Sequence, residues 1–377
     1  MGADVRHVGL LPTIADSLGV SLPSAGLLVS LYALGVTIGA PVLTAMTGGL
    51  PRKTLLLALM VLFIAGNTFA AFAPGYGSLI VARFITGLAH GVFFAIASTI
   101  AAGLVSREKE SSAIAMVFMG LTVALVTGVP LGTWVGQTFG WQSTFLGVAI
   151  LGVIGLISSA ILVPSNLPQT ASPSLRAQAQ VLTSLRLLLV YLITAIGYGG
   201  NFVAFTYLAP MLTGVTGLSA GAVSFVILLY GASVAAGNIL GGKLADRMGP
   251  VPALTLIFSG LAIMLAALGL ALPYPVAAIA VVALWGGFAF ANVPPLQSYV
   301  VQIARQVSPD AVDVASGLNI GAFNLGIALG AWSGGLVVDH IGLAATPFIG
   351  ALAVAAGIGL TRLSGRLDRT ASQPAHA

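Results

Sequence analysis

Charged residues are scarce in this 377-residue chain and cysteine is absent: the sequence has 14 Lys and Arg, 9 Asp and Glu, and no Cys. The lack of cysteine excludes disulfides, thiolate metal sites and cysteine nucleophiles, although it identifies no compartment. The charged fraction of 6% is far below the roughly 25% of soluble domains. Such a chain has too little charge to cover a soluble surface, so the composition excludes an ordinary soluble protein.

The charges that are present stand in small clusters between long uncharged runs. Residues 17–51, 54–82 and 84–106 contain no Asp, Glu, Lys or Arg, and the uncharged runs 111–175 and 187–242 are long enough for two spans each. A helix needs about 20 apolar residues to cross a bilayer. We therefore predict an all-α integral membrane protein with a partial helix before Asp16 and eleven full spans. The full spans are expected near 24–46, 54–73, 77–103, 112–137, 143–163, 183–211, 221–242, 251–272, 275–301, 314–337 and 343–361.

The basic residues predict the orientation of these spans. Twelve of the fourteen lie in alternate connections or in the tail, and the intervening connections carry none. The positive-inside rule makes their side cytoplasmic. We therefore expect a multi-pass membrane protein with a cytoplasmic C-terminus. The net charge of +5 is then an orientation signal and requires no nucleic-acid partner.

A shift of 198 residues superimposes the two halves of the chain without gaps. Gly19, Ser21 and Tyr32 meet Gly217, Ser219 and Tyr230, and Gly132-Thr133-Trp134-Val135-Gly136 meets Gly330-Ala331-Trp332-Ser333-Gly334. Parallel six-helix repeats predict two bundles around an axis along the membrane normal, with a substrate site between them near the midplane. The expected parts are an N-terminal bundle at 1–163, a cytoplasmic linker at 164–186, a C-terminal bundle at 187–363 and a cytoplasmic tail at 364–377.

The same register places the expected start of the first half before Met1, because the seventh span follows Arg186. We therefore expect the first helix to be truncated, with only its outer end left around Val8–Ala15. A signal peptide is the alternative interpretation, but it needs an apolar stretch directly after Arg6 and a cleavage site.

Three glycine-containing patterns follow one another along the chain. Arg83-Phe84-Ile85-Thr86-Gly87-Leu88-Ala89-His90-Gly91 lies in the fourth span, Gly128-Val129-Pro130-Leu131-Gly132 with Gly136 in the fifth, and Gly242-Lys243-Leu244-Ala245-Asp246-Arg247-Met248-Gly249 after the eighth. Together they resemble the major facilitator superfamily, and within it the twelve-helix drug:proton antiporters and sugar-efflux-permease-like members. The first-half copy of the loop pattern keeps Arg52 and Lys53 but has Gly48 and Pro51 where the family has Asp and Gly.

The resemblance implies a secondary active transporter of the bacterial inner (plasma) membrane, with proton-coupled efflux of a small neutral or amphipathic solute (sugar, nucleoside or drug) by alternating access. Its partners would be a small-molecule substrate, a proton and the lipid bilayer, and we expect a monomer without a cofactor or metal. One alternative is a non-transporting remnant of such a permease. An intramembrane enzyme is a weaker alternative, because the histidines at 7, 90, 340 and 376 form no recognisable site. A channel would not need two repeated halves.

Arg83, His90 and Asp4 are the candidates for proton coupling. Arg83 stands inside an apolar stretch, where a guanidinium costs about 2.5–3.5 kcal/mol and should face a cavity or a partner. His90 lies two helical turns further on a similar face, and imidazole titrates near neutrality; the alternative is a packing histidine. Asp4 aligns without gaps with an acidic residue of the family's first helix, but Arg6 and His7 depart from that pattern.

Two groups of residues are expected to act in the conformational change. The first group is Asp246 and Arg247 with Gly242, Gly249 and the degenerate first-half pair Arg52 and Lys53. Their charges near helix ends should latch the bundles in the outward-facing state; ordinary solvated loop charges are the alternative. Gly128, Gly132 and Gly136 form a smooth stripe, and Pro130 bends its helix. The stripe predicts a tight contact between bundles, or else generic small-residue packing.

A set of uncharged polar and aromatic residues in the second half is predicted to line the substrate cavity. Pro294-Pro295 should break the tenth helix beside two of them and free backbone carbonyls. This lining would suit a neutral or moderately apolar solute, although several members could equally be interhelical hydrogen bonds. The set comprises Tyr198, Asn201, Phe202, Phe205, Asn292, Gln297, Asn319 and Asn324.

Overall fold

The computed structural model describes residues 10–165, 167 and 174–372, which are helical almost throughout. The helices before residue 165 are α1 (Leu10–Leu18), α2 (Leu22–Thr47), α3 (Arg52–Ala71), α4 (Tyr76–Gly103), α5 (Glu110–Val123), α6 (Val129–Phe139) and α7 (Trp141–Leu162). A π-helical turn, η3 (Ala124–Gly128), joins α5 to α6, and a 3₁₀ turn, η2 (Arg107–Lys109), precedes α5. Asp4 and the start of the predicted partial helix lie outside the described residues.

The second half is built in the same way. Its helices are α8 (Leu175–Thr183), α9 (Leu185–Ile193), α10 (Gly199–Phe205), α11 (Leu208–Gly214), α12 (Ala220–Met248), α13 (Pro250–Ala271), α14 (Pro275–Ala289), α15 (Val293–Val307), α16 (Val312–His340) and α17 (Thr346–Ser372). The short turns are η4 (Thr194–Tyr198), η5 (Pro309–Ala311) and η6 (Leu343–Ala345). The predicted break is present: α14 ends at Ala289, and α15 begins at Val293 with proline in its first turn.

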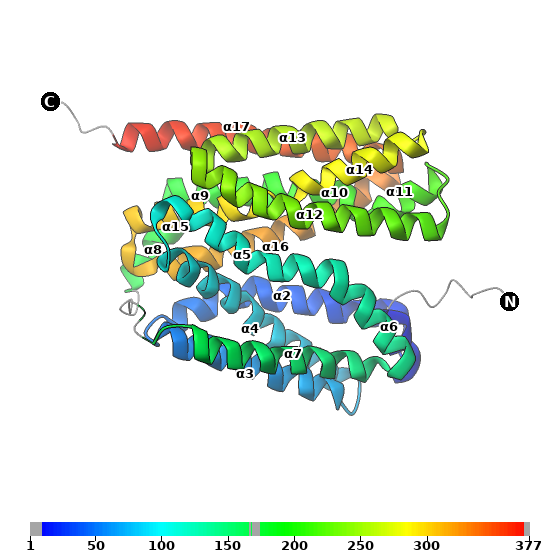
Figure 1. The fold of residues 1–377 in the computed structure, drawn as a ribbon, viewed down its shortest axis with the longest axis horizontal. Helices are drawn as coiled ribbons and strands as arrows, with labels where there is room; N and C mark the ends of the chain where they lie inside the picture. Colours follow the sequence, from blue (N-terminus) through cyan, green and yellow to red (C-terminus); the bar gives the residue numbers. More distant parts are fainter. Residues whose placement is uncertain (1–9, 166, 168–173, 373–377) are drawn as a thin grey trace.

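Ten described helical segments are long and apolar enough to cross a membrane. They coincide with ten of the eleven full spans that the sequence predicts. The remaining one, predicted at 112–137, is the continuous helical stretch formed by α5, η3 and α6, which changes direction near η3 in Figure 1. The all-α membrane fold is therefore confirmed.

Repeat-related positions have the same local structure. Ser21 and Ser219 each cap a helix, accepting hydrogen bonds at 3.3 Å from the backbone N–H of Ser24 and Ala222. Gly19 and Gly217, two residues earlier, have φ of 62° and 75°, a conformation that glycine adopts without steric cost. These pairs are 198 residues apart, so the layout is consistent with two parallel repeats.

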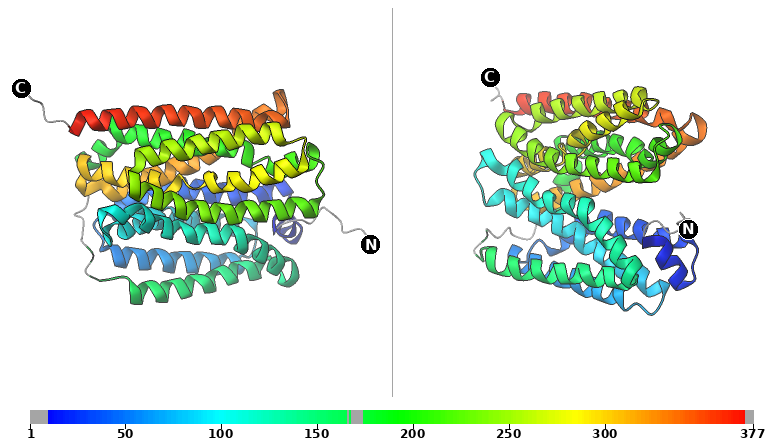
Figure 2. Two further views of the ribbon diagram at one scale, coloured as in Figure 1. Left: turned by 45° about the horizontal axis from the view of Figure 1, so that its top comes forward. Right: turned by 45° about the vertical axis from the view of Figure 1, so that its right-hand side comes forward.

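The helices form two groups in space. Figure 1 shows α2, α3, α4 and α7 in one group and α9 to α17 in the other, and the views of Figure 2 separate them in the same way. α5 leaves the first group and packs against α12 and α15 of the second, while α2 packs against α16. The domain boundaries stay predictions; α8 lies within the expected linker, and α17 continues beyond residue 363 to Ser372.

One end of the molecule, here called the basic end, carries Arg52, Arg107, Arg186, Arg247 and Arg305, which lie at the helix ends on the left of Figure 1. The opposite end carries α6 and α11. Hydrogen bonds to Asp368 of α17 link three helices at the basic end of the second half. Arg186 Nε of α9 donates to this carboxylate at 2.7 Å, and the Tyr299 hydroxyl of α15 donates to it at 2.6 Å.

Candidate substrate cavity and coupling residues

A cavity of about 570 Å³ lies between the two halves. That volume is within the range of small-molecule sites. Its lining comes from α2, α4 and α5 of the first half and from α10, α12, α15 and α16 of the second, with single residues from the turns beside them. The lining residues are Val29, Tyr32, Ala33, Val36, His90, Phe94, Phe118, Leu121, Thr122, Tyr198, Phe202, Phe205, Ser224, Ile227, Leu228, Tyr230, Gly231, Val234, Phe290, Val293, Ile320, Phe323, Asn324 and Ile327.

Aromatic rings make up much of the wall of this cavity. Tyr198 lies 4.9 Å from Phe323 and 5.6 Å from Phe290 between ring centroids, both edge-to-face. Phe205 stacks on Tyr230 at 5.0 Å. Such a wall binds apolar and aromatic groups by dispersion and ring quadrupole contacts. The polar side chains on it are few, and none of them is an Asp, Glu, Lys or Arg.

Four of the predicted cavity residues line it: Tyr198, Phe202, Phe205 and Asn324. Tyr32, His90 and Tyr230 line it as well, although the sequence had not suggested Tyr32 or Tyr230 for this role. Both tyrosines had stood out only as a matched pair in the repeat. The repeat offered the signal that could have identified them: the same residue type stands at equivalent positions of two halves that meet at a central site.

The other four predicted residues lie behind the wall instead of on it. Asn201, Asn292, Gln297 and Asn319 are fully buried. Asn201 Oδ1 accepts from Trp285 Nε1 at 2.7 Å, and Asn319 Nδ2 donates to Gln297 Oε1 at 2.8 Å. Each of the four side chains donates or accepts a hydrogen bond within the second half. They do not line the central cavity in this conformation, and their contact with substrate stays a prediction.

Tyr32 connects the two coupling candidates of the described chain. The guanidinium carbon of Arg83 lies 4.0 Å from the centroid of the Tyr32 ring, and the Tyr32 hydroxyl lies 2.6 Å from His90 Nδ1. A cation over an aromatic face is stabilised by the ring quadrupole, most strongly away from water. Arg83 therefore has a partner inside the first bundle, as its position in an apolar helix requires. Asp4 lies outside the described residues.

The basic end is closed by ionic contacts between the halves. Arg52 of α3 donates to both carboxylate oxygens of Asp313 at 3.1 Å, and the Thr99 hydroxyl donates to Asp313 Oδ1 at 2.5 Å. Arg305 of α15 pairs with Glu110 at the start of α5. Bidentate arginine–carboxylate pairs are strong and directional. The sequence motifs had suggested Arg52 but gave no signal for Asp313, Glu110 or Arg305.

Asp246 makes a second kind of contact across the basic end. Its carboxylate oxygens accept from the backbone N–H groups of Ser111 and Ser112 at 2.8 and 3.0 Å. These N–H groups belong to the first turn of α5, where a negative charge is favoured by the helix dipole. The predicted latch role of Asp246 is compatible with this geometry.

The other residues of the loop pattern are placed differently. Gly242 lies so close to α5 that an added Cβ would meet Ala115 and Ser111. Gly249, with φ of 82°, separates α12 from α13, and Arg247 is exposed. Lys53 donates to the Ala160 carbonyl oxygen at 2.8 Å within the first half, so it makes no contact across the two halves there.

At Gly132 and Gly136 the small-residue stripe packs within its own bundle, and not against the other bundle as predicted. An added Cβ at Gly132 would meet Thr144 of α7, and one at Gly136 would meet Leu10 of α1 and Thr144. Both therefore face their own bundle, where the Thr144 hydroxyl donates to the Gly132 carbonyl oxygen at 2.8 Å. Gly128 and Pro130 lie at the junction of η3 with α6, where the helix changes direction. The bend is as predicted, whereas the packing partner is not.

Among the described residues there is no group of three or more His, Cys, Asp or Glu that could hold a metal ion. The arrangement is instead that of a cavity between two halves, shut at one end by polar contacts.

Comparisons with known proteins agree with this arrangement. A family model described as Major Facilitator Superfamily matches residues 7–331. The chain is 50% identical over 368 residues to the uncharacterized MFS-type transporter YtbD of Bacillus subtilis, covering 98% of this chain and 93% of that protein. It is 40% identical over 365 residues to the inner membrane transport protein YdhP of Escherichia coli, covering 95% and 91%.

A more distant relative and one solved structure add to these. A chloramphenicol resistance protein of Streptomyces lividans is 33% identical over 372 residues, with 94% of each chain covered. The crystal structure of the E. coli fucose:proton symporter FucP aligns with a TM-score of 0.75 over 94% of this chain and 93% of that one. At 16% identity, the likeness to FucP is one of fold.

Proposed function

Because the chain belongs to the Major Facilitator Superfamily, we propose that it exports a small neutral or amphipathic solute in exchange for protons, by alternating access. It would act as a transporter of the bacterial inner membrane, not as an enzyme. The observation that carries the proposal is the cavity between the halves, which is closed at the basic end by contacts that join one half to the other.

The orientation is part of the proposal. The positive-inside rule puts the basic end, and with it the end of α17, in the cytoplasm. Val29 of α2 and Leu228 of α12 are exposed lining residues near the starts of their helices, at the opposite end. In this orientation the described conformation is closed to the cytoplasm and the cavity extends toward the outside.

The lining supports a substrate that is uncharged and partly apolar. Phe202, Phe205, Phe290 and Phe323 offer ring faces and edges, and Asn324 offers an amide. A drug, a nucleoside or a sugar derivative with an apolar group would fit these contacts. The name of the Streptomyces relative, a chloramphenicol resistance protein, makes chloramphenicol the first compound to test.

Proton coupling would use the residues joined through Tyr32. Arg83 and His90 both contact Tyr32. Protonation of His90 would therefore place a second cation near the Arg83 guanidinium, and the two like charges would repel each other. The repulsion would favour a rearrangement of α2 against α4. Because α2 also packs against α16 of the other half, such a rearrangement would reach the interface between halves.

The experiment is an accumulation assay in bacterial cells with and without the gene. Labelled chloramphenicol, sugars and nucleosides are loaded, and retention is followed before and after a protonophore collapses the pH gradient. We expect at least one solute to be retained less by expressing cells, with the difference lost on protonophore addition. Equal retention of every solute, with the protein shown to be in the membrane, would favour a non-transporting protein.

A further inference from the structure

A chain of buried hydrogen bonds runs through the second half and ends on the first half. Thr194 Oγ1 of η4 donates to Asn319 Oδ1 of α16 at 2.7 Å, and Asn319 Nδ2 donates to Gln297 Oε1 of α15 at 2.8 Å. Gln297 Nε2 donates to Ser316 Oγ of α16 at 2.6 Å, and Ser316 Oγ donates to the Ala95 carbonyl oxygen of α4 at 2.8 Å. The four side chains are fully buried and are here called the polar relay.

The direction of the polar relay is fixed by its last acceptor. A backbone carbonyl oxygen can only accept, so Ser316 donates to Ala95 and its own oxygen is left to accept from Gln297. The Gln297 and Asn319 amides then each have one orientation, with the oxygen toward one neighbour and the nitrogen toward the next. Hydrogen bonds arranged head to tail in this way polarise one another. The strength of the bond to Ala95 therefore depends on the bonds behind it.

Thr194 differs from several threonines in the helices of the second half. Thr206, Thr213 and Thr361 each donate to the backbone carbonyl four residues earlier in the chain, a common arrangement for threonine in a helix. The Thr194 hydroxyl is directed to α16 instead. Thr194 is also the first residue of the π-helical turn η4, and such turns are frequent at functional sites. The relay therefore begins where the seventh span departs from regular α-helical geometry.

One turn beyond Thr194, the same two elements meet at the wall of the central cavity between the halves. Tyr198 is the last residue of η4, and Phe323 follows Asn319 by four residues. The two rings lie 4.9 Å apart between centroids, and both line the cavity. A solute that inserts between these rings would separate η4 from α16. The hydrogen bond from Thr194 to Asn319 is the next contact toward the basic end, so the same separation would weaken it.

The other end of the relay lies among the contacts that close the basic end. Ser316 follows Asp313, the partner of Arg52, by three residues and directly precedes Gly317, which approaches the backbone of α2. The bond from Ser316 to Ala95 crosses between the halves beside these two contacts. It therefore contributes to closure of the basic end without involving a charged group.

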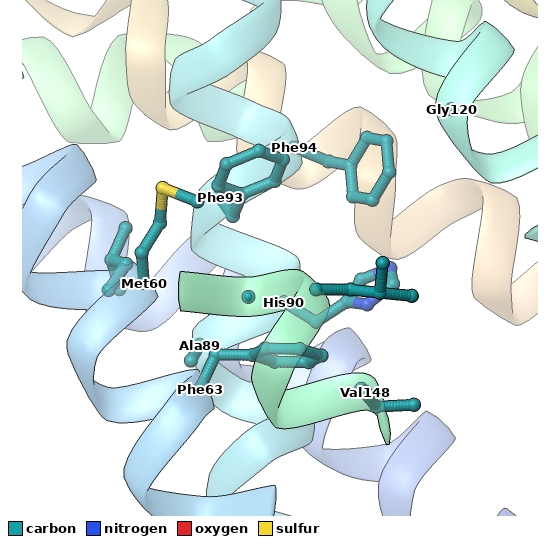
Figure 3. A pocket seen from close by; sticks show the side chains of 11 residues that line it. Met60, Phe63, Ala89, His90, Phe93, Phe94, Gly120 and Val148 are labelled. Atoms are coloured by element: carbon teal, nitrogen blue, oxygen red, sulfur yellow. The ribbon is translucent and has the colours of Figure 1, made fainter. Parts of the chain in front are cut away.

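The segment of α4 that accepts this last hydrogen bond also carries part of the cavity wall. Ala95 directly follows Phe94, whose ring lies 4.8 Å from the His90 ring between centroids. Figure 3 shows Phe94 and His90 on the same side of α4, and both line the central cavity. The relay thus holds the part of α4 that carries a proposed coupling residue.

We propose that the polar relay couples the wall of the central cavity to closure of the basic end. Its four members are positioning residues: they hold α16 against α4 while the rings of Tyr198 and Phe323 are in contact, and this hold weakens when the rings separate. The coupling is a property of the folded chain, whereas its use to signal an occupied cavity rests on the proposed function.

The test is a double-mutant cycle between the two ends of the relay, Thr194→Val and Ser316→Ala, whose hydroxyls donate to different partners. The full chain carries spin labels at Leu104→Cys and Met248→Cys, exposed positions of the two halves, and is reconstituted in vesicles. The distance distribution gives the ratio of open to closed basic ends. Each substitution alone should raise this ratio roughly 2- to 10-fold, the effect of one hydrogen bond. The double variant should show only the larger single effect, because either substitution interrupts the same relay.

Matched controls remove a hydroxyl that donates to a carbonyl of its own span. Thr206→Val and Ser333→Ala are such variants and should leave the ratio unchanged. Thr194→Ser keeps the hydroxyl and should retain the ratio of the unsubstituted chain. If Thr194→Val with Ser316→Ala elutes as an aggregate, Gln297→Met replaces Ser316→Ala in the cycle. The same non-additivity is expected there, because Gln297 lies between the two ends.

Effects of Thr194→Val and Ser316→Ala that multiply in the double variant would overturn the proposal, because the two ends would then act independently. An unchanged ratio in either single variant would overturn it as well. The cycle uses neither a solute nor a pH gradient, so a chain that transports nothing can still show the coupling. Failure of the relay and failure of the proposed function are therefore distinguishable.

Discussion

The Arg52 guanidinium of the first half holds the Asp313 carboxylate of the second half at 3.1 Å, with both side chains largely buried. Asp313 lies in the first turn of α16, which corresponds in the repeat to α5. On the other side of the pseudo-symmetric interface, Asp246 accepts hydrogen bonds from the first turn of α5. Arg52 at the start of α3 and Asp246 near the end of α12 thus each contact the first turn of a helix of the other half, with the carboxylate on opposite partners.

The carboxylate of Asp313 compensates for the lack of an acidic residue at position 48. Where the second-half loop has Asp246, the first-half loop has Gly48, and the acid stands instead on the helix that the loop contacts. Arg52 then supplies the opposite charge. Closure of the basic end is therefore expected to depend on both contacts.

Arg52→Gln and Asp313→Asn should each weaken closure of the basic end. Removing one partner of a buried pair costs roughly 3–5 kcal/mol, because the other charge is left unpaired. The measurement is the rate at which maleimide labels Ser298→Cys, since Ser298 is buried against Ser111 of the other half and the chain has no cysteine of its own. Labelling should accelerate in both variants, and the exchanged pair Arg52→Asp with Asp313→Arg should restore the slow rate. Independent, additive effects of the two substitutions would count against a direct pair.

Asp246→Asn should also open the basic end. The substitution keeps the size of the side chain and removes the charge that the two N–H groups of α5 stabilise, a loss of about 1.5–3 kcal/mol. The same Ser298→Cys labelling rate should rise. Asp310→Asn, which removes an exposed charge at the same end, is the control and should leave the rate unchanged.

Gly317→Ala should disfavour the closed state by steric contact. An added Cβ at Gly317 would collide with the Ala40 carbonyl oxygen of α2, whereas one at Gly321, one turn later, would reach the Thr37 carbonyl oxygen at 3.5 Å, an ordinary contact. Overpacking of this kind costs about 1–3 kcal/mol. We expect faster Ser298→Cys labelling for Gly317→Ala than for Gly321→Ala. Equal rates in the two variants would contradict the close approach of α2 and α16.

Two substitutions at Tyr32 separate the roles of Arg83 and His90. Tyr32→Phe keeps the ring beneath the guanidinium and removes the hydroxyl bonded to His90. We expect it to retain efflux but to change its pH dependence, as His90→Ala should. Tyr32→Leu also removes the cation–π contact and should lose efflux, as Arg83→Ala should, with membrane insertion intact. Wild-type efflux by Arg83→Ala at every pH would remove Arg83 from the mechanism, and an unchanged pH profile in His90→Ala would make His90 a packing residue.

The spans were predictable because hydropathy and the spacing of charges report burial in lipid directly. The break at Pro294-Pro295 was predictable too, since helix breaks depend on local backbone chemistry. Asn201 and Gln297 lie behind the wall of the cavity in this conformation, which the sequence could not indicate because side-chain direction around a helix is decided by packing partners. Their contact with substrate stays a prediction. Gly132 and Gly136 show the same limit: a smooth stripe identifies a close contact but not the helix that makes it.

The central claim is that the two ends of the molecule open alternately. It is tested most directly by spin-label distances in two double-cysteine variants: Leu104→Cys with Met248→Cys across the basic end, and Phe72→Cys with Tyr274→Cys across the opposite end. All four residues are exposed and each pair joins the two halves. We predict that a change of pH, or addition of the solute found in the accumulation assay, lengthens the basic-end distance and shortens the opposite-end distance together. Distances that stay fixed under every condition, or that change at one end alone, would contradict the account.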